Sequence, residues 1–217
     1  MPRQAATARD APKANKARPA QSRSRQTRRK IVKSAVQLWM GRGFDQSFDT
    51  TTVDEIADNA GVSRATVYYY FPKKEDILRE LAWVTADDIY ECALRSMMNG
   101  QPVNSVLDDI MGKLGAKVTR SSPAVVKRML QLRHNDAETI NRETLGGLTR
   151  TFSVALTHAQ EMGELPKQLS AMEIAEVIAS AAMGCISKWS IMGDEFDLVA
   201  RLRSRAMLVL TGARNLA

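Results

Sequence analysis

Apolar positions recur with helical spacing along most of the chain. Val53, Ile56, Ala57 and Ala60 fall at i, i+3, i+4 and i+7, which places one apolar stripe on a short helix. The same spacing predicts further helices at about 26–42, 74–98, 103–119, 124–135, 138–162, 171–192 and 195–213. No strand-like alternation appears after Gly100. We therefore predict an all-α protein.

The segment 51–74 has the pattern of a helix-turn-helix. Thr52 and Glu55 form the S/T-x-x-E signature that caps a helix start. Gly61 supplies a residue that adopts positive φ at a sharp turn. Ser63 then caps a second helix beginning at Arg64. Such a unit places its second helix in the major groove of duplex DNA.

Two further observations bear on this segment. Small Ala57 lets the second helix approach closely, and Val67 points back into the angle between the helices. Any compact helical pair needs such residues, so they alone leave a purely structural interpretation open. The groups that follow the turn bind phosphates and base edges and favour the DNA-binding interpretation: Thr66, Tyr68, Tyr69, Tyr70, Lys73 and Lys74.

Positive charge is concentrated at the amino end. The 217 residues carry a net charge of +7, but residues 1–30 hold ten basic residues against Asp10, and the rest of the chain is slightly acidic. This asymmetry predicts a polyanionic partner near that end. Residues 1–24 have almost no large apolar side chains, so we expect a disordered basic arm that lies along DNA, or alternatively a solubilising tail.

The overall composition is that of a soluble globular protein, with 44% apolar and 25% charged residues. No run of about 18 apolar residues is present, so no membrane partner is expected. Cys92 and Cys185 are isolated in helical patterns, which favours free thiols in a reducing cytoplasm. We expect a cytoplasmic, nucleoid-associated protein.

Catalytic and metal-binding patterns are weak. His134, Asp136 and Glu138 could be imagined as ligands, but their spacing does not put all three on one helix face. No P-loop, GxGxxG or nucleophile elbow occurs. We therefore expect no cofactor, no metal and no enzymatic activity.

Several large side chains in the predicted C-terminal part, 74–217, could line a pocket for a largely apolar molecule, with ordinary core filling as the alternative. The candidates are Trp83, Tyr90, Met129, Arg133, Phe152 and Trp189.

Over about residues 26–80 the chain resembles the N-terminal domain of TetR-family transcriptional regulators. The shared features are the Gly43-Phe44 pair, T-T-V-D-E-I-A, A-G-V-S-R-A-T-V-Y-Y-Y-F and P-K-K-E-D-I-L, in that order. One departure is the segment D-Q-S-F-D-T-T before Thr52, which lengthens the first connection and leaves Phe48 in need of a place in the core.

The resemblance implies roles for individual residues in DNA binding. Arg64 would contact guanine, Ala65 a thymine methyl, and Thr66 a base edge. Ser63 would cap the recognition helix, Tyr69 would pack at the groove wall, and the phosphate contacts would come from Thr52, Tyr68, Tyr70 and Lys74. Arg28, on the polar face of the first helix, completes the predicted set.

The resemblance also implies two domains, 25–73 for DNA binding and 74–217 for effector binding and dimerisation. The homodimer would pair the last two helices through Ile178, Cys185, Trp189, Leu198, Leu202 and Val209. The predicted function is a ligand-responsive repressor that binds a palindromic operator and is released by a small effector. A DNA-binding protein without a ligand, governed by a protein partner or acting architecturally, is the alternative, and a filled C-terminal core would favour it.

Overall fold

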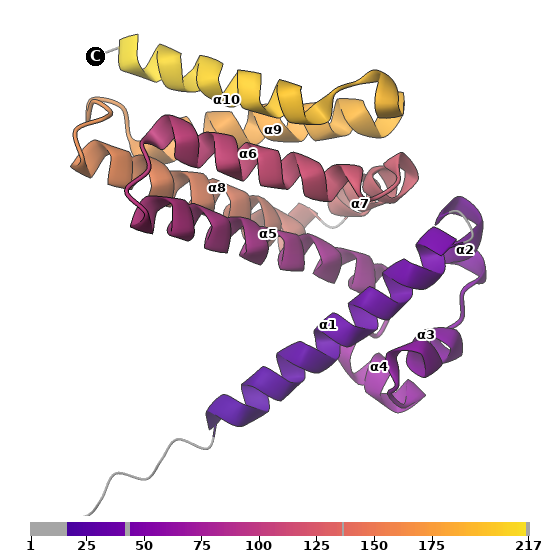
Figure 1. Ribbon diagram of the computed structural model, residues 1–217. Helices are drawn as coiled ribbons and strands as arrows, with labels where there is room; N and C mark the ends of the chain where they lie inside the picture. Colours follow the sequence, from indigo (N-terminus) through magenta and orange to yellow (C-terminus); the bar gives the residue numbers. More distant parts are fainter. Residues whose placement is uncertain (1–16, 42–43, 136, 216–217) are drawn as a thin grey trace, which may run out of the picture.

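The computed structural model describes the backbone of residues 17–41, 44–135 and 137–215. Within these ranges the side chains at 17–22, 41, 45–46, 82–84, 133–135 and 137–146 are not described. Every regular element in the described ranges is a helix, which confirms the all-α class. A small N-terminal unit of helices α1–α4 projects from a larger bundle of helices α5–α10 (Figure 1).

The N-terminal unit surrounds its own apolar core. Its helices are α1 (Ala17–Gly41), α2 (Phe44–Thr50), α3 (Val53–Ala60) and α4 (Arg64–Tyr70). Ile31 and Trp39 of α1 are buried against Ile56 of α3 and Val67 of α4. Burying such side chains contributes roughly 1.5–3 kcal/mol each, so this core sets the angle between the helices.

Helix α1 begins at Ala17, earlier than the predicted start near Gln26. Pro19 lies in the first turn, where a missing N–H costs nothing, and the alanine, arginine and glutamine residues that follow are good helix formers. The part of the predicted disordered arm from residue 17 to 24 is therefore helical. The remainder of that arm, residues 1–16, lies outside the described residues.

The unusually long first connection contains a helix of its own, α2. Phe44 and Phe48 of α2 pack edge-on against Trp39, with ring centroids 6.1 and 5.0 Å from it. Phe48 is only 4% exposed, so it does find a place in the core. The inserted residues thus extend the core of the N-terminal unit instead of forming a loose loop.

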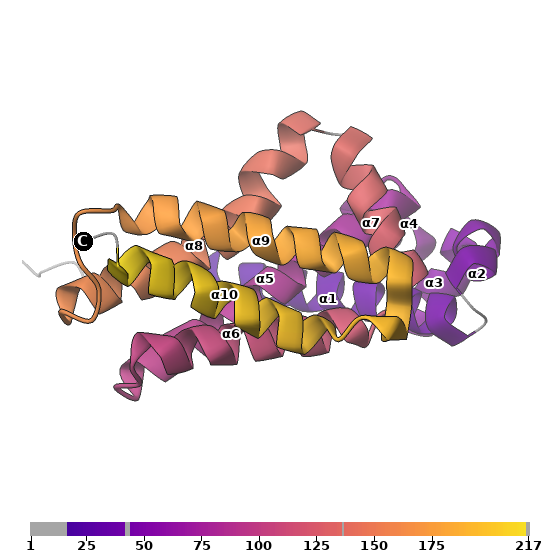
Figure 2. The ribbon, with the colours of Figure 1, turned by 90° about the horizontal axis from the view of Figure 1, so that it is seen from above.

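The C-terminal bundle is the larger unit. Its helices are α5 (Lys74–Met98), α6 (Val103–Thr119), α7 (Pro123–Asn135), α8 (Ala137–Glu161), α9 (Ala171–Met192) and α10 (Leu198–Asn215), with a 3₁₀ turn at Gly193–Glu195. Helix α9 packs against α8 and α10, and α10 also packs against α6. Figure 2 shows α9 and α10 running side by side along one face of the bundle.

Helix α9 with the turn that follows it, Ala171–Glu195, is long and apolar enough to cross a membrane by length and composition alone. Half of its most apolar window is buried inside the bundle. Packing against α8 and α10 therefore accounts for much of its apolar character, as in the core helix of many globular proteins.

Candidate nucleic-acid interface and inter-domain cavity

Local hydrogen bonds close both ends of α3. The Glu55 amide donates to Thr52 Oγ1 at 3.2 Å, and the Thr52 amide donates to Glu55 Oε2 at 2.8 Å, which completes the predicted capping box. Gly61 has φ 65° and ψ 41°, and the Val62 amide donates to the Ala57 carbonyl at 3.0 Å. This is a Schellman turn, which requires a left-handed residue at the glycine position.

Helix α4 buries one face and presents the other to solvent. The Thr66 amide donates to Ser63 Oγ at 3.1 Å, which caps the helix start as predicted. Val67 is fully buried, whereas Tyr69 is 81% exposed and Tyr68 is 42% exposed. Ala65 is exposed as well, so the first turn of α4 is accessible to a partner.

Arg64 already lies among groups that orient it. Its Nη1 atom lies 3.2 Å from Asp54 Oδ2, and its guanidinium lies 5.5 Å from the centroid of the Tyr68 ring. A side-chain hydrogen bond with Tyr68 and, to a smaller extent, the negative charge of Asp54 raise the pKa of Arg64 above its ordinary value. Both ends of the ion pair are more than half exposed, so Asp54 holds the guanidinium weakly and a base edge can replace it.

Lys74 does not lie free for a DNA phosphate. Its Nζ atom donates to the backbone carbonyls of Phe48 at 2.7 Å, Asp49 at 3.1 Å and Thr51 at 3.0 Å. An ammonium group has three protons, and these three acceptors match them. Lys74 therefore fastens the carboxyl end of α2 to the start of α5, and the neighbouring exposed Lys73 is the better phosphate candidate.

Arg28 is also bound to another side chain of the protein, Glu80. Its Nε and Nη2 atoms donate to Glu80 Oε1 at 3.1 Å and Oε2 at 2.6 Å, a bidentate pair between α1 and α5. Its guanidinium also lies 5.4 Å from the centroid of the Phe71 ring. Its placement favours a role in joining the two domains over the predicted contact with DNA. Tyr70 is half-buried and lines the cavity described next.

A cavity of about 610 Å³ lies between the two domains. Helix α1 contributes Arg28 and Val36, and the end of α4 contributes Tyr70. The N-terminal unit, α1–α4, which contains the predicted DNA-binding helices, therefore forms part of the cavity wall. Phe71 and Pro72 between α4 and α5 also line it, and the other apolar lining comes from the bundle: Leu78, Leu81, Ala86, Val118, Val126, Met129, Leu130, Leu132, Leu148, Met183 and Ile186. Its volume is in the range of small-molecule sites, and most of its lining belongs to the C-terminal bundle, so the bundle leaves space for a ligand at its border with the N-terminal unit.

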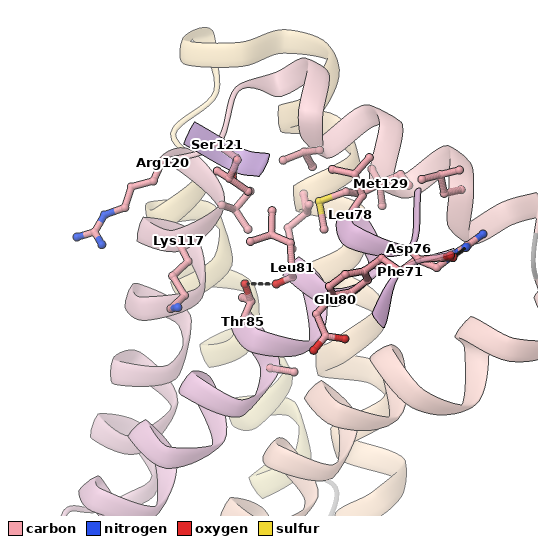
Figure 3. Close-up of a pocket in the computed structure, with 18 of the residues that line it drawn as sticks. Phe71, Asp76, Leu78, Glu80, Leu81, Thr85, Lys117, Arg120, Ser121 and Met129 are labelled. Atoms are coloured by element: carbon pink, nitrogen blue, oxygen red, sulfur yellow. Dashed lines mark hydrogen bonds and ion pairs between the residues drawn. The ribbon is translucent and has the colours of Figure 1, made fainter. Parts of the chain in front are cut away.

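Cations lie at one edge of this cavity. Figure 3 shows Lys117 and Arg120 there, with Arg120 extending outward, whereas Leu78, Leu81 and Met129 lie around the interior. Lys117 forms an ion pair with Asp88 of α5. The cavity thus combines an apolar interior with Lys117 and Arg120 at one edge, and its lining also includes the ion pairs Arg28–Glu80 and Arg79–Asp76.

Of the six residues predicted to line a pocket, the structure places only some at the cavity. Met129 lines the cavity. Phe152 and Trp189 are buried in the bundle core instead, and Tyr90 packs under the Arg150 guanidinium at 5.8 Å. The side chains of Trp83 and Arg133 lie outside the described residues.

Most of the lining that α5 provides could not be identified from the sequence. Leu78 and Leu81 belong to the apolar stripe of the predicted helix 74–98, but the i, i+3 spacing does not distinguish a core contact from a cavity wall. Only the packing of α5 against α6 and α8 separates the two outcomes.

The predicted dimer residues require a correction. Ile178, Cys185, Trp189, Leu198 and Leu202 are each at most 2% exposed within one subunit, and Val209 is half-buried. A side chain enclosed by its own subunit cannot contact a second one. The most apolar positions of α9 and α10 are therefore core positions, and a dimer through these helices would have to use their exposed faces.

A different face of the same helices is open. Val177, Ser180, Gly184, Ser187 and Ile191 form one exposed stripe along α9, with Val177 54% and Ile191 78% exposed. No side chain lies within 4 Å of the position that a Cβ would take at Gly184 or at Gly212. On α10 the exposed residues include Ser204, Leu208 and Gly212, which are spaced four residues apart and so share one face, and Leu208 is 74% exposed.

Among the described residues, no group of histidine, cysteine, aspartate and glutamate is arranged to hold a metal ion. The side chains of His134, Asp136 and Glu138 lie outside that set.

Comparison with known proteins agrees with this geometry. Residues 31–81 match the family model described as bacterial regulatory proteins, tetR family. The chain is 25% identical over 187 residues to the fatty acid metabolism regulator protein of Bacillus subtilis, covering 85% of this chain and 94% of that protein. It is 27% identical over 182 residues to the transcriptional repressor BepR of Brucella suis, covering 80% and 85%.

Solved structures show the same fold. The chain superimposes with a TM-score of 0.69 on Thermus thermophilus FadR, a TetR-family repressor crystallised with lauroyl-CoA, at 24% identity and with 85% and 94% of the two chains covered. Bacillus subtilis FadR in complex with stearoyl-CoA gives a TM-score of 0.63 at 23% identity, with 84% and 97% covered. Residues 31–81 thus match the tetR family of bacterial regulatory proteins, and this match together with the full-length relatives identifies the chain as a DNA-binding transcriptional regulator.

Proposed function

We propose that this protein is a homodimeric repressor that an amphipathic effector releases from a palindromic operator. The observation that carries the proposal is the cavity between the domains, because α1 and α4 of the DNA-binding unit share its wall with the bundle. A molecule that fills it contacts both units at once. To weaken DNA binding tenfold, it needs only about 1.4 kcal/mol of preference for the non-binding arrangement.

The chemistry of the cavity favours an apolar chain with an anionic head. The interior walls are leucine, valine, isoleucine and methionine side chains, and Lys117 and Arg120 stand at the rim. Phosphates interact favourably with such cations. Acyl-CoA thioesters have this construction, and two structural relatives were crystallised with them. We therefore propose acyl-CoA as the effector class.

A neutral apolar effector is the second candidate. Met129 and Met183 both line the cavity, and thioethers adapt to ligands of varied shape. A structural relative with a TM-score of 0.62, SmeT, is described as the repressor of a multidrug efflux pump. This candidate predicts that neutral hydrophobic compounds release the protein from DNA without help from the cationic rim.

The dimer would form through the exposed stripe of α9 and the adjoining face of α10. Small residues at Ser180, Gly184 and Ser187 permit close approach of a second helix pair, and Val177 and Ile191 supply apolar area at the ends of the stripe. The twofold operation then presents two α4 helices to successive major grooves, about 34–36 Å apart. The site of action would be chromosomal DNA in the cytoplasm.

The test begins with selection of an operator from random duplexes by the purified dimer. Binding to that operator is then measured by fluorescence anisotropy during titration with lauroyl-CoA, stearoyl-CoA, CoA alone, laurate and the neutral alcohol 1-dodecanol. The proposal expects release by at least one thioester and none by CoA alone. Release only by neutral hydrophobic compounds would favour the second candidate, and no release by any compound would contradict both.

A further inference from the structure

Helix α2, the helix that the lengthened connection forms, packs against α7 of the C-terminal bundle. We propose that α2 is a coupling strap: through Phe48 and Arg128 it makes the DNA-binding unit follow α7 when the cavity between the domains is occupied. The inference rests on the proposed ligand-dependent release and concerns how occupancy reaches the DNA-binding unit.

The first step is that α2 moves with the DNA-binding unit. Phe48 packs on Trp39 and lies 5.3 Å from the Phe44 ring inside that unit's core. The Lys74 ammonium group fixes the last turn of α2 through three carbonyl oxygens and lies 5.3 Å from the Phe48 ring centroid. A closely packed core of this kind transmits displacement instead of absorbing it.

The second step is that α7 belongs to both sides of the domain boundary. Val125 is 4% exposed and lies within the apolar core of the DNA-binding unit. Val126 and Leu130, on the same helix, line the cavity, and Met129 and Leu132 do so while also packing on that core. A ligand that displaces α7 must therefore either carry α2 along or break the contact between them.

The contact between Arg128 of α7 and Phe48 of α2 decides whether α2 follows α7 or separates from it. The Arg128 guanidinium lies 5.7 Å from the centroid of the Phe48 ring. Its buried Nε atom has no hydrogen-bond partner within the described part of the chain. Arg128 borders a separate crevice of about 270 Å³ between α2 and α7, and it is not part of the lining of the main cavity. It can thus be changed without removing a ligand contact.

The experiment compares Arg128→Ala with Lys127→Ala and Arg128→Lys. Lys127 is the adjacent exposed cation on α7 and borders the same crevice, so its removal matches the loss of charge. For each dimer three quantities are measured: operator affinity without ligand, lauroyl-CoA affinity without DNA, and operator affinity at saturating lauroyl-CoA. Stearoyl-CoA is the second probe, and circular dichroism verifies folding.

Arg128→Ala should bind lauroyl-CoA and operator separately within about twofold of wild type, yet remain on the operator when ligand is added. We expect the ligand-induced loss of operator affinity to fall roughly three- to tenfold, which is a change of about 0.7–1.4 kcal/mol in coupling free energy. Lys127→Ala should respond like wild type, and Arg128→Lys, which keeps a cation over the ring, should recover part of the response.

A wild-type response that persists in folded Arg128→Ala would overturn the strap while leaving the proposed function intact. An equal loss of response in Lys127→Ala would also overturn it, because the effect would then follow from charge alone. If neither thioester changes the operator affinity of the wild-type dimer, the proposed function fails and the strap fails with it.

Discussion

The helix pair α3–α4 and the helix pair α9–α10 differ in what fixes their geometry. In α3–α4 the caps and the turn are formed by neighbours within a few residues: Thr52 with Glu55, Gly61 with the end of α3, and Ser63 with Thr66. In α9–α10 the role of each residue depends on which distant helix faces it. The first pair can therefore be interpreted from sequence, whereas the second pair cannot.

The largest loss of stability should come from truncating a buried side chain at a position that the sequence pattern assigns to the dimer interface. Trp189→Ala should lower the free energy of unfolding by about 3–5 kcal/mol, because a fully enclosed indole leaves a large cavity. Urea denaturation followed by circular dichroism measures this. If Trp189→Ala changed only the dimer dissociation constant and left the free energy of unfolding of the subunit unaltered, Trp189 would instead be an interface residue.

A charge on the open face should act on the dimer instead. Leu208→Asp should weaken dimerisation about 100-fold, close to 2.8 kcal/mol, because the exposed leucine lies on the proposed contact face and a buried carboxylate there has no partner. Sedimentation velocity measures the dissociation constant. Met98→Asp, at an 84% exposed position on α5, is the matched control and should remain dimeric. An intact Leu208→Asp dimer would remove α10 from the interface.

Within the helix-turn-helix, Arg64→Ala should cost about 1–3 kcal/mol of operator affinity and relax the preference at one base pair. The measurement is anisotropy on the operator and on single-base variants of it. Lys73→Ala is the comparison, since removing a phosphate contact weakens all sequences alike and lowers the salt slope by about 1. Equal losses for Arg64→Ala on operator and random DNA would show that Arg64 does not contact bases.

The smallest expected effect concerns Lys74. Lys74→Met should lower the free energy of unfolding by roughly 1–2 kcal/mol, because three carbonyl oxygens at the end of α2 lose their donor. The slope of operator affinity against salt concentration should not change. A slope reduced by about 1, with stability intact, would instead make Lys74 the phosphate ligand that the family resemblance implies.

These contrasts show what the sequence could predict. Capping residues and the turn glycine act locally, so the sequence predicts the capping box of Thr52 and Glu55, the turn at Gly61 and the cap at Ser63, and the structure has all three. Helix periodicity also located nearly every helix, although α1 begins earlier than expected and α2 was not anticipated as a helix. In both cases favourable propensity or core packing extended the helical structure beyond the region where the apolar stripe is visible.

Residue roles across the domain boundary were harder to predict, for a physical reason. An arginine on the polar face of a helix binds DNA or a carboxylate depending on which partner the fold brings close, and Arg28 meets Glu80. In the same way, Leu78 and Phe152 are both apolar helix positions, but one lines a cavity and the other fills the core. Such distinctions arise only when helices distant in sequence pack together.

The central claim is that filling the cavity between the domains changes the separation of the two α4 helices. The most direct test is pulsed electron–electron double resonance between spin labels at Ala65→Cys in the dimer, with Cys92→Ser and with Cys185 retained, since Cys185 is buried and its burial raises the pKa of its thiol. Without ligand, the distances should be consistent with one turn of DNA, about 34–36 Å. Saturating lauroyl-CoA should shift that distribution by several ångströms, whereas superimposable distributions with and without bound ligand would contradict the account.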